Sequence, residues 1–411
     1  MRVLIVGAGA IGSATALELA RRGVAVTVID RADVGAGCSY GNAGWLTPSL
    51  AFPLPAPGVV RTSLKWLLDP ESPLYIRPAA SLEWVRWLAG FVRAATHERH
   101  ERGTAALVPL SRYSLEAFAA LDRESPGSFG FSPTGLLLVA QTAAGLASAT
   151  REAQRMEAHG TVWRALDPAG VRELEPAVTG ELAGGIYFPN EAHCEPLAVV
   201  QALARAATAA GARFEPQTEV FAFRREGRRL AAVRTTRGWM EADRFVLATG
   251  SWSRAHGRQL GFRLPVLGGK GYAIVVDGLP RPPRLPLKVL ERRVAITPRA
   301  GSTRLAGTLE LVDGDESIAP RRVDAIVRNS RTVLDIPEVP HVVELWRGLR
   351  PCTPDGLPVI GFAPGYDNLL LATGHQMCGL HTAPGTGRLT ADLLTGEQPR
   401  FDPAPFRADR F

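Results

Sequence analysis

The sequence predicts an α/β protein of two domains, one of which is assembled from separated stretches of the chain. Three observations support this fold. A buried strand, a glycine-rich turn and a helix open the chain, and strands that end in glycine recur near its middle and close to its end. A strand-rich stretch with a different pattern lies between them. At 411 residues the chain has the length of two ordinary domains.

The first element is a βαβ unit. Val3–Val6 is a short continuous apolar run, which is typical of a buried parallel strand. A helix is predicted over Ile11–Arg22, where Gly23 ends it, and a second strand over Ala25–Ile29. Alternation of strand and helix in this manner predicts a Rossmann-like, doubly wound domain.

Later segments of the same pattern are predicted to join this domain. A helix over Leu197–Ala210 leads into a strand meander, and "RFVLATGSWS" and "NLLLATGHQM" are strands that end in a glycine turn. A second sheet is predicted from the strand-rich stretch Leu264–Leu311. We therefore divide the chain into a nucleotide-binding domain of residues 1–50, 194–255 and 340–411 and a substrate domain of residues 51–193 and 256–339.

The composition excludes several classes of protein. The chain is 46% hydrophobic and 21% charged, as in ordinary globular proteins, and no run of eighteen apolar residues predicts a membrane-spanning helix. The net charge of +7 comes from scattered arginines, because Lys65, Lys270 and Lys288 are the only lysines. We therefore predict no nucleic-acid binding, while a weak attraction to an anionic membrane surface stays compatible with this charge.

The cysteines give no sign of a metal site. Cys38, Cys194, Cys352 and Cys378 have no metal-ligand spacing and form no CxxC pair. They are predicted to be reduced thiols, with no bound metal. We expect a cytoplasmic protein that is at most peripheral on the inner face of the cell membrane.

Gly7, Gly9 and Gly12 form a G-x-G-x-x-G pattern between the first strand and the first helix. Gly7 makes the tight turn, Gly9 lets the backbone approach a pyrophosphate, and Gly12 permits close packing of helix on strand. The helix begins around Ala10 and Ile11, where free N–H groups can bind a phosphate. The pattern therefore predicts a nucleotide site.

Asp30 stands at the end of the second predicted strand. A carboxylate about twenty residues after the glycines can accept hydrogen bonds from the hydroxyls of an adenosine ribose, and Arg31 beside it is assigned to the same site. The strand, helix, second strand and acid together predict a bound ADP group. They do not distinguish NAD from FAD, because both cofactors contain an ADP half.

The stretch "GAGCSYGNAGWLTP" (Gly35–Pro48) favours FAD. It replaces the third βα unit with which a nicotinamide-binding domain would normally continue, and the longer FAD needs extra backbone for its ribityl chain and ring. Ser39 is predicted to bond phosphate or ribityl oxygens. The backbone beneath the isoalloxazine, where larger side chains would collide, is assigned to Gly41, Asn42, Ala43 and Gly44. Backbone contacts to the adenine and pyrophosphate are assigned to Val220, Ala248, Thr249 and Gly250.

Six stretches carry a resemblance to a known family. In chain order they are "VGAGAIGSATALELARRGVAVTVID", "NAGWLTP", "LATGSWS", "KGYAI", "WRGLRPCTPDGLPVIG" and "TGHQMCGLHTAPGTGRLTADLLTG". This order resembles the FAD-dependent D-amino-acid oxidase superfamily over nearly the full chain, and within it the bacterial D-amino-acid dehydrogenases. The resemblance implies a Rossmann-like FAD-binding domain and an α+β substrate domain whose mixed sheet covers the flavin ring.

The same resemblance implies the reaction. A free D-amino acid would pass a hydride from Cα to flavin N5, giving an imine that hydrolyses to a 2-oxo acid and ammonia. The electrons would then pass to a quinone or another acceptor. Such a step needs orientation more than a strong base, because the lone pair of the neutral amine assists the departure of hydride.

Three residues are predicted to act on the substrate. Arg350, in "GLRP", can form two parallel bonds to a carboxylate. Tyr272, in "KGY", can bond the same carboxylate, with a ring packed in the sheet as an equal alternative. His375, in "TGH", follows a strand end where its ring can face substrate or flavin, or else serve the structure.

Gly348, Gly374, Gly379 and Leu380 complete the predicted cofactor site. Gly379 and Leu380 precede a helix whose N-terminus would face the N1–C2=O edge of the flavin and stabilise its reduced state. FAD is expected to be non-covalent, because Cys352 does not match the attachment cysteine of related amine oxidases.

Alternatives stay open at this point. Within the superfamily, a glycine- or sarcosine-type oxidase and a hydroxyproline dehydrogenase differ from the main prediction in pocket size rather than in motif. A protein that binds a nucleotide without turnover is the alternative from another class. No motif fixes the enantiomer, the oligomeric state, or the choice between oxygen and a quinone.

Overall fold

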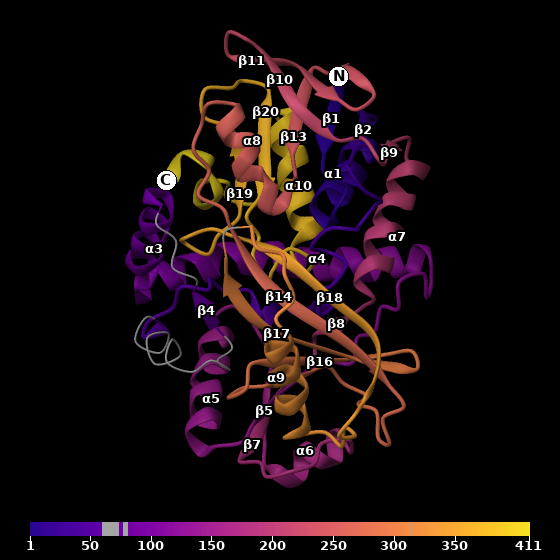
Figure 1. Ribbon diagram of the computed structural model, residues 1–411, viewed down its shortest axis with the longest axis vertical. Coiled ribbons are helices and arrows are strands. Elements are labelled where there is room, and N and C mark those ends of the chain that lie inside the picture. The colour runs from indigo at the N-terminus through magenta and orange to yellow at the C-terminus, as the bar shows by residue number, and fades with distance from the viewer. Residues whose placement is uncertain (60–73, 77–80, 313) are drawn as a thin grey trace.

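Two large β-sheets form the frame of the molecule, one in the upper and one in the lower half of Figure 1. The structure, a computed structural model, describes residues 1–59, 74–76, 81–312 and 314–411. Part of the proline-rich stretch in the predicted substrate domain lies outside these residues. The mixed α/β architecture with a Rossmann-like half confirms the predicted fold class.

The first sheet has six strands in the order β19-β20-β13-β1-β2-β9. Their bounds are β1 Arg2–Val6, β2 Ala25–Ile29, β9 Arg213–Glu215, β13 Arg244–Leu247, β19 Val359–Phe362 and β20 Leu369–Thr373. Neighbours run parallel except β19 and β20. The chain proceeds from β1 to β2 on one side and returns to β13 on the other, so the carboxyl end of β1 lies at a topological switch point, where such sheets bind ligands.

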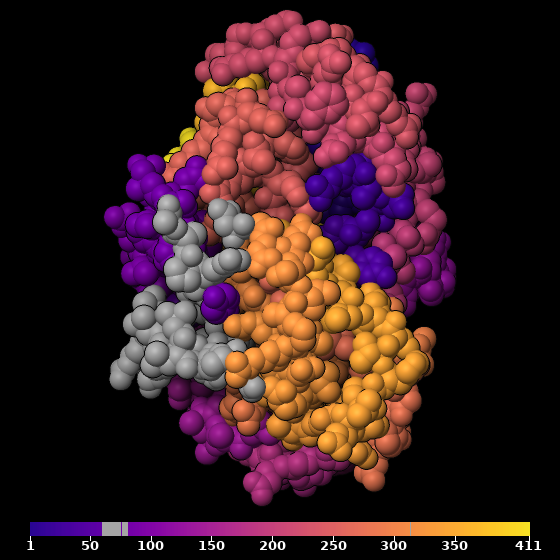
Figure 2. Space-filling model, viewed as in Figure 1, coloured from indigo at the N-terminus to yellow at the C-terminus, as the bar shows by residue number. Residues whose placement is uncertain are grey.

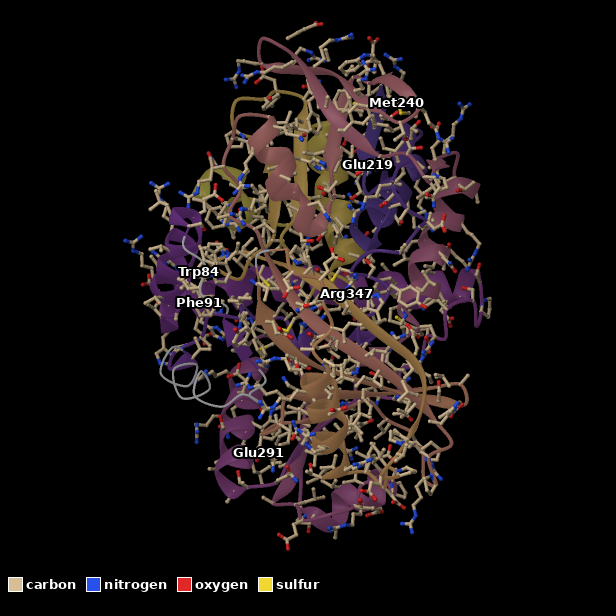
Figure 3. The ribbon with its side chains drawn as sticks, viewed as in Figure 1. Trp84, Phe91, Glu219, Met240, Glu291 and Arg347 are labelled. Atoms are coloured by element: carbon tan, nitrogen blue, oxygen red, sulfur yellow. The ribbon has the colours of Figure 1, made fainter. Side chains whose placement is uncertain are left out.

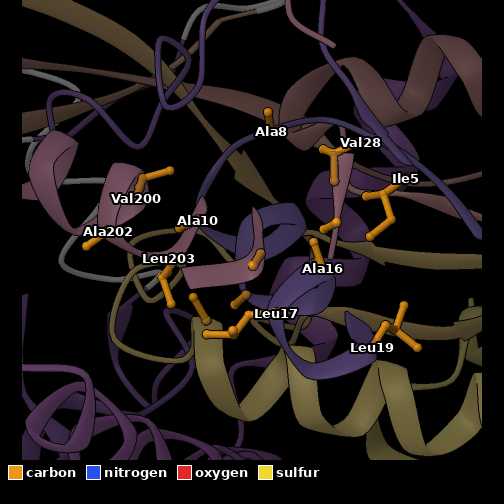
Figure 4. Close-up of a cluster of buried hydrophobic side chains, with 14 of the residues drawn as sticks. Ile5, Ala8, Ala10, Ala16, Leu17, Leu19, Val28, Val200, Ala202 and Leu203 are labelled. Atoms are coloured by element: carbon orange, nitrogen blue, oxygen red, sulfur yellow. The ribbon is translucent and has the colours of Figure 1, made fainter. Parts of the chain in front are cut away.

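Alanine-rich helices pack on one face of this sheet. They are α1 Ala10–Arg21, α7 Pro196–Ala209 and α10 Ala383–Thr395. A Cβ on Gly387 of α10 would lie 2.7 Å from the backbone oxygen of Ala14 in α1, so these two helices touch along their backbones. Figure 4 shows the shared core, with Leu17 from α1 next to Leu203 from α7.

A small antiparallel meander covers the opposite face. Its strands are β10 Val220–Glu226, β11 Arg229–Thr235 and β12 Gly238–Glu241, and the helix α8 Ser253–Gln259 follows. Leu230 and Val233 of the meander pack against Leu4 and Phe245 of the sheet. The first sheet is therefore buried on both faces, as the continuous apolar strands predict.

The second sheet has nine strands and is mixed. Eight of them follow the order β18-β14-β17-β16-β15-β5-β7-β6, and β4 pairs with β17. The pairs β15–β5 and β17–β4 are parallel and the others antiparallel. The bounds are β4 Leu74–Ile76, β5 Leu136–Ala140, β6 Arg164–Leu166, β7 Gly184–Phe188, β14 Leu267–Asp277, β15 Leu287–Val289, β16 Val294–Arg299, β17 Ser302–Leu311 and β18 His341–Cys352.

Further helices surround this sheet and join it to the first. They are α3 Leu82–Ala94, α4 His97–Glu124, α5 Ala143–Glu157, α6 Pro168–Leu174 and α9 Pro320–Arg331. Ile326 of α9 packs on Ile274 and Leu305 in the centre of the sheet. A two-stranded ribbon of β3 Trp45–Leu46 and β8 Ala192–His193 leads into the short 3₁₀ helix η1 Pro48–Leu50.

The strand pairing adds one detail to the predicted division into domains. The sequence assigns residues 341–352 to the nucleotide-binding domain, together with the rest of the segment 340–411. In the structure they form β18, which pairs with β14 along its length and thus belongs to the second sheet. The chain returns to the first sheet only at β19.

Candidate functional site

The glycine-rich turn has a backbone that only glycine permits at two of its three positions. Gly7 has φ of +112°, and a Cβ there would overlap the carbonyl oxygen of Ala248. A Cβ on Gly12 would overlap the Gly7 carbonyl, whereas one on Gly9 would meet only Ser39 Oγ, at 3.3 Å. Gly7 and Gly12 therefore join β1, β13 and α1, and Gly9 lies where a pyrophosphate can approach.

Asp30 fixes this turn to the end of β2. Its Oδ2 accepts a hydrogen bond from the backbone N–H of Ala8 at 2.7 Å, and its Oδ1 accepts one from Ala32 at 3.0 Å. Its own carbonyl accepts from the N–H of Thr218 at 2.6 Å. The predicted ribose contact of Asp30 would add to these bonds, since a carboxylate can accept up to four.

Ser39 and Arg31 lie next to the same turn. Ser39 Oγ accepts a hydrogen bond from the backbone N–H of Ala10, the first residue of α1, at 3.1 Å. This hydroxyl therefore stands at the helix N-terminus, where the pattern places a phosphate. The guanidinium of Arg31 lies 4.1 Å from the centre of the Trp252 ring, which follows β13.

A chain of hydroxyl groups crosses the carboxyl ends of β13 and β20. Thr249 Oγ1 lies 2.9 Å from Ser253 Oγ, which donates to Thr373 Oγ1 at 2.9 Å. Thr373 Oγ1 donates in turn to the carbonyl of Gly250, whose φ is +53°. The predicted cofactor residues Ala248, Thr249 and Gly250 therefore lie together at the switch point. The side chain of Val220, by contrast, is buried in the core under the meander.

Residues 35–44, which we call the seat loop, lie against the second sheet. Arg304 Nη1 donates to the carbonyl of Asn42 at 2.8 Å, and Thr297 Oγ1 donates to that of Ala43 at 2.8 Å. Gly44 has φ of +81°, and a Cβ there would overlap the carbonyl of Cys194. In Figure 2 this early part of the chain, in indigo, reaches the surface between the upper and lower halves of the molecule.

Gly41 of the seat loop has a neighbour that the sequence did not predict. A Cβ on Gly41 would overlap the indole of Trp346, and a Cβ on Gly348 would overlap the same ring. The sequence assigns both glycines to the cofactor site, and Gly41 in particular to the backbone beneath the flavin, where larger side chains would collide. The side chain that requires glycine at both positions in the structure is Trp346 of β18.

Arg350 lies on the face of the second sheet that meets the seat loop. A Cβ on Gly271 would overlap its guanidinium, and Arg350 Nη1 donates to the carbonyl of Thr308 at 3.0 Å. Thr308 has φ of +63°, a strained value for a β-branched residue, at a bulge where β17 has one residue more than β14. Within the described part of the chain, no carboxylate forms an ion pair with Arg350.

Two thiols flank Arg350. Burial raises the pKa of Cys38, in the seat loop, and raises that of Cys352, in β18, to about 12; the positive charge of Arg350 lowers both in part. Arg350 is therefore close enough to both sulfurs for its charge to act on them. Both thiols are protonated at neutral pH and are poor nucleophiles in this state.

Tyr272 points away from Arg350. Consecutive residues of a strand face opposite sides of a sheet, so Tyr272 projects opposite to Gly271, over which Arg350 lies. Its ring is buried under α9, and its hydroxyl oxygen accepts a hydrogen bond from the N–H of Ala319 at 3.2 Å. Burial, with Glu310 nearby, raises the pKa of Tyr272. This is the packed alternative that the sequence also allowed, and it does not support the predicted contact with substrate.

His375 has a partner within the first domain. Its side chain is buried, and its Nε2 lies 3.0 Å from Thr386 Oγ1 in α10. Burial lowers the pKa of His375 to about 3, so the ring is neutral at physiological pH. A Cβ on Gly379 would lie 3.4 Å from His375 Cβ. These contacts give His375 a structural role in holding the turn before α10.

The rest of that turn is also tightly packed. Gly374 has φ of +80°, and a Cβ there would lie 2.7 Å from Thr353 Cγ2. Leu380 is buried in the core of the first domain. The N–H of Gly385, in the first turn of α10, donates to Ser114 Oγ of α4 at 2.9 Å. One of the free N–H groups expected to face the flavin is therefore taken up by α4.

Sequence reasoning missed Arg304 and Trp346. Arg304 is 3% exposed, and its signal is an arginine directly before the apolar pair Leu305 and Ala306 of a predicted strand. Trp346 precedes Arg350 by four residues, and this even spacing places both on one face of a strand. Within the described residues, no group of three or more His, Cys, Asp or Glu side chains could hold a metal ion.

Glu191 is a buried carboxyl group just before β8. Its Oε1 accepts a hydrogen bond from the N–H of Ser49 in η1 at 3.1 Å, and burial raises the pKa of Glu191 to about 8. A raised folded-state pKa means that the fold binds this proton more tightly than the unfolded chain does. Stability is therefore lost as the pH rises from about 4.5, the ordinary value, through about 8.

We expect Glu191→Gln to remove this pH dependence. The free energy of unfolding of the wild type should fall, relative to that of the variant, by about 1.4 kcal/mol per pH unit in that range. Urea unfolding of both proteins at several pH values between 5 and 8 measures the difference. Parallel curves would show that Glu191 ionises in the fold as readily as in the unfolded chain.

The comparisons with known proteins agree with this geometry. Residues 2–393 match the family described as FAD dependent oxidoreductase. The chain belongs to this family of FAD-dependent oxidoreductases. It is 34% identical to D-amino acid dehydrogenases of Rhizorhabdus wittichii and Agrobacterium fabrum, over 426 and 418 aligned residues that span all of each chain.

Solved structures show the same fold. The glycine oxidase of Geobacillus kaustophilus superimposes with a TM-score of 0.81 at 27% identity, covering 100% of this chain and 99% of that one. An L-proline dehydrogenase of P. horikoshii gives a TM-score of 0.80 at 18% identity, covering 100% and 97%. The cofactor is FAD, and the open side of Gly9 at the N-terminus of α1, next to Ser39, fits its pyrophosphate.

Proposed function

We propose that this protein is a dehydrogenase of free D-amino acids that forms 2-oxo acids and ammonia. The observation that carries the proposal is Arg350, whose guanidinium lies over Gly271 of the second sheet and has no carboxylate partner within the described residues. A half-buried arginine held by one carbonyl keeps donors free for a bidentate bond to a carboxylate. The 34% identical D-amino acid dehydrogenases support the choice of substrate.

Bound FAD would supply the two-electron acceptor, N5, to which hydride passes from the substrate Cα. The chain itself positions the substrate. The Thr308 carbonyl orients the Arg350 guanidinium, and Arg350 holds the carboxylate. The ammonium group of the substrate loses one proton before hydride departs, and water then hydrolyses the imine.

We further propose that the electrons pass to a quinone and that the protein binds peripherally to a membrane. In the described residues, no helix is long and apolar enough to cross a bilayer. Helix α3, however, exposes Leu82, Val85 and Val92 by 63%, 55% and 52%, beside the exposed Arg86 and Arg93. Figure 3 shows the helix, marked by Trp84 and Phe91, at the edge of the molecule. Apolar side chains next to arginines suit an anionic lipid surface.

A substrate panel tests the function. We expect the purified protein to be yellow and to bleach anaerobically with D-amino acids but not with L-amino acids. With D-amino acids it should reduce a dye without forming peroxide, and reduce a quinone faster when the quinone is in anionic vesicles. A protein without flavin absorbance after reconstitution with FAD would contradict the proposal. Turnover of L-amino acids only would contradict it as well.

One alternative keeps structural support. The superposition on a glycine oxidase favours, as second candidate, an oxidase of glycine or sarcosine. The same panel separates the two. Peroxide formed with glycine or sarcosine, together with no reduction of the dye by D-amino acids, would favour the oxidase. Hydroxyproline in the panel tests the remaining alternative of this superfamily.

A further inference from the structure

Trp346 lies beside Arg350 on the sheet face that meets the seat loop. Its indole is held between two glycines, because a Cβ on either Gly41 or Gly348 would overlap the ring. The ring of Tyr40 also stacks on the indole of Trp346, with the ring centres 6.5 Å apart and the ring planes at 24°. The position of the indole is therefore fixed by the backbones of the loop and of β18 and by a second aromatic ring.

The indole and the guanidinium of Arg350 are immediate neighbours. Gly271 and Gly348 are directly paired across β14 and β18. The guanidinium lies over Gly271, and the indole lies over Gly348. Since paired residues of antiparallel strands have Cα atoms about 5 Å apart, the two groups lie side by side. A carboxylate bound by Arg350 would thus place its Cα close to the indole.

The opposite side of Arg350 is filled as well. Two residues along β18, on the same face, lies Cys352, which is 1% exposed. Its carbonyl accepts a hydrogen bond at 3.1 Å from Nε1 of Trp87, a tryptophan that is also 1% exposed. A substrate held by Arg350 therefore has side chains next to it on both sides along the strand.

We propose that Trp346 limits the size of the substrate side chain, so that the protein prefers small amino acids such as alanine to bulky ones such as phenylalanine. This inference rests on the proposed function. The ring fills the space over Gly41 and Gly348 that a larger substrate side chain would need. Close packing makes an additional ring there costly, because neither glycine backbone can withdraw from it.

The test compares Trp346→Ala with the wild type. We expect the ratio of kcat/KM for D-phenylalanine to that for D-alanine to rise by about tenfold or more in Trp346→Ala, as for other changes of pocket size. Trp346→Phe, which keeps most of the bulk, should stay within about threefold of the wild-type ratio. Trp239→Ala is the matched control, since Trp239 is 45% exposed on the distant meander and should leave the ratio unchanged.

Other outcomes would overturn the inference. An unchanged or lower ratio in Trp346→Ala would show that the indole does not limit size. An equal rise of KM for both substrates would show that it positions Arg350 instead. If Trp346→Ala fails to retain FAD, Trp346→Leu serves in its place, and an unchanged ratio there contradicts the inference. A wild-type protein that is inactive with every amino acid would refute the proposed function and, with it, the size limit that rests on that function.

Discussion

Arg350→Ala is expected to lower kcat/KM for every amino acid substrate by about 30-fold to several thousand-fold. The range follows from about 2–5 kcal/mol for removing one partner of a buried, charged hydrogen-bonded pair. Most of the loss should appear as a higher KM, because Arg350 binds a carboxylate that does not react. The variant should stay yellow, since Arg350 touches Gly271 and Thr308 rather than the glycine-rich turn. Steady-state kinetics with a dye acceptor measure the change.

Arg347→Ala is the matched control for this variant. Arg347 lies three residues before Arg350 in β18, near the centre of Figure 3. It faces the other side of the sheet, where its Nη2 forms an ion pair with Glu316 at 2.8 Å. We expect kcat/KM to change by no more than about threefold, as for other partly exposed ion pairs. An Arg350→Ala protein that loses FAD but keeps its substrate affinity would contradict the assignment.

Gly9→Ala is expected to weaken FAD binding while leaving the apoprotein folded. The added methyl group meets only Ser39 Oγ, at a tight 3.3 Å, so this one hydroxyl has to move by a few tenths of an ångström to accommodate it. It occupies the side from which a pyrophosphate approaches, and overpacking of this kind costs about 1–3 kcal/mol, or about 5- to 150-fold in Kd. Titration of apoprotein with FAD, followed by flavin fluorescence, measures the loss. Thermal unfolding of the apoprotein should be unchanged.

Alanine variants of two further glycines are the controls for this experiment. Gly37→Ala should change neither FAD affinity nor stability, because a Cβ there meets nothing within 4 Å. Gly12→Ala should lose both, because its Cβ would overlap the Gly7 carbonyl. Equal FAD affinity in Gly9→Ala and the wild type would place the pyrophosphate elsewhere.

Local sequence patterns predicted the nucleotide-binding half well. The helices expected over Ile11–Arg22 and Leu197–Ala210 begin and end one residue earlier in the structure. Apolar runs, glycines and caps act over a few residues, so they can be read from the sequence directly. The position of Arg350 on an inner sheet face is also compatible with its motif, although its contact with substrate stays a prediction.

Side-chain direction at the site depends on distant parts of the chain. Tyr272 adjoins Gly271 in sequence, yet only the pairing of β14 with β18 and the packing of α9 decide which of the two faces Arg350. The same holds for His375, whose partner Thr386 lies in the following helix. The extra residue of β17 at Thr308 leaves no sequence signal, because nothing in the type of residue marks a bulge there.

The order of strands in the first sheet has a consequence for how the enzyme is made. Strand β1 pairs with β2, which follows at once, but its other neighbour β13 spans Arg244–Leu247, and β20 beyond it spans Leu369–Thr373. Contacts this distant in sequence form slowly, and during synthesis they must wait for the later residues to emerge. We therefore expect a nascent chain to acquire its affinity for FAD only after β20 has emerged from the ribosome, when the second domain has had time to fold.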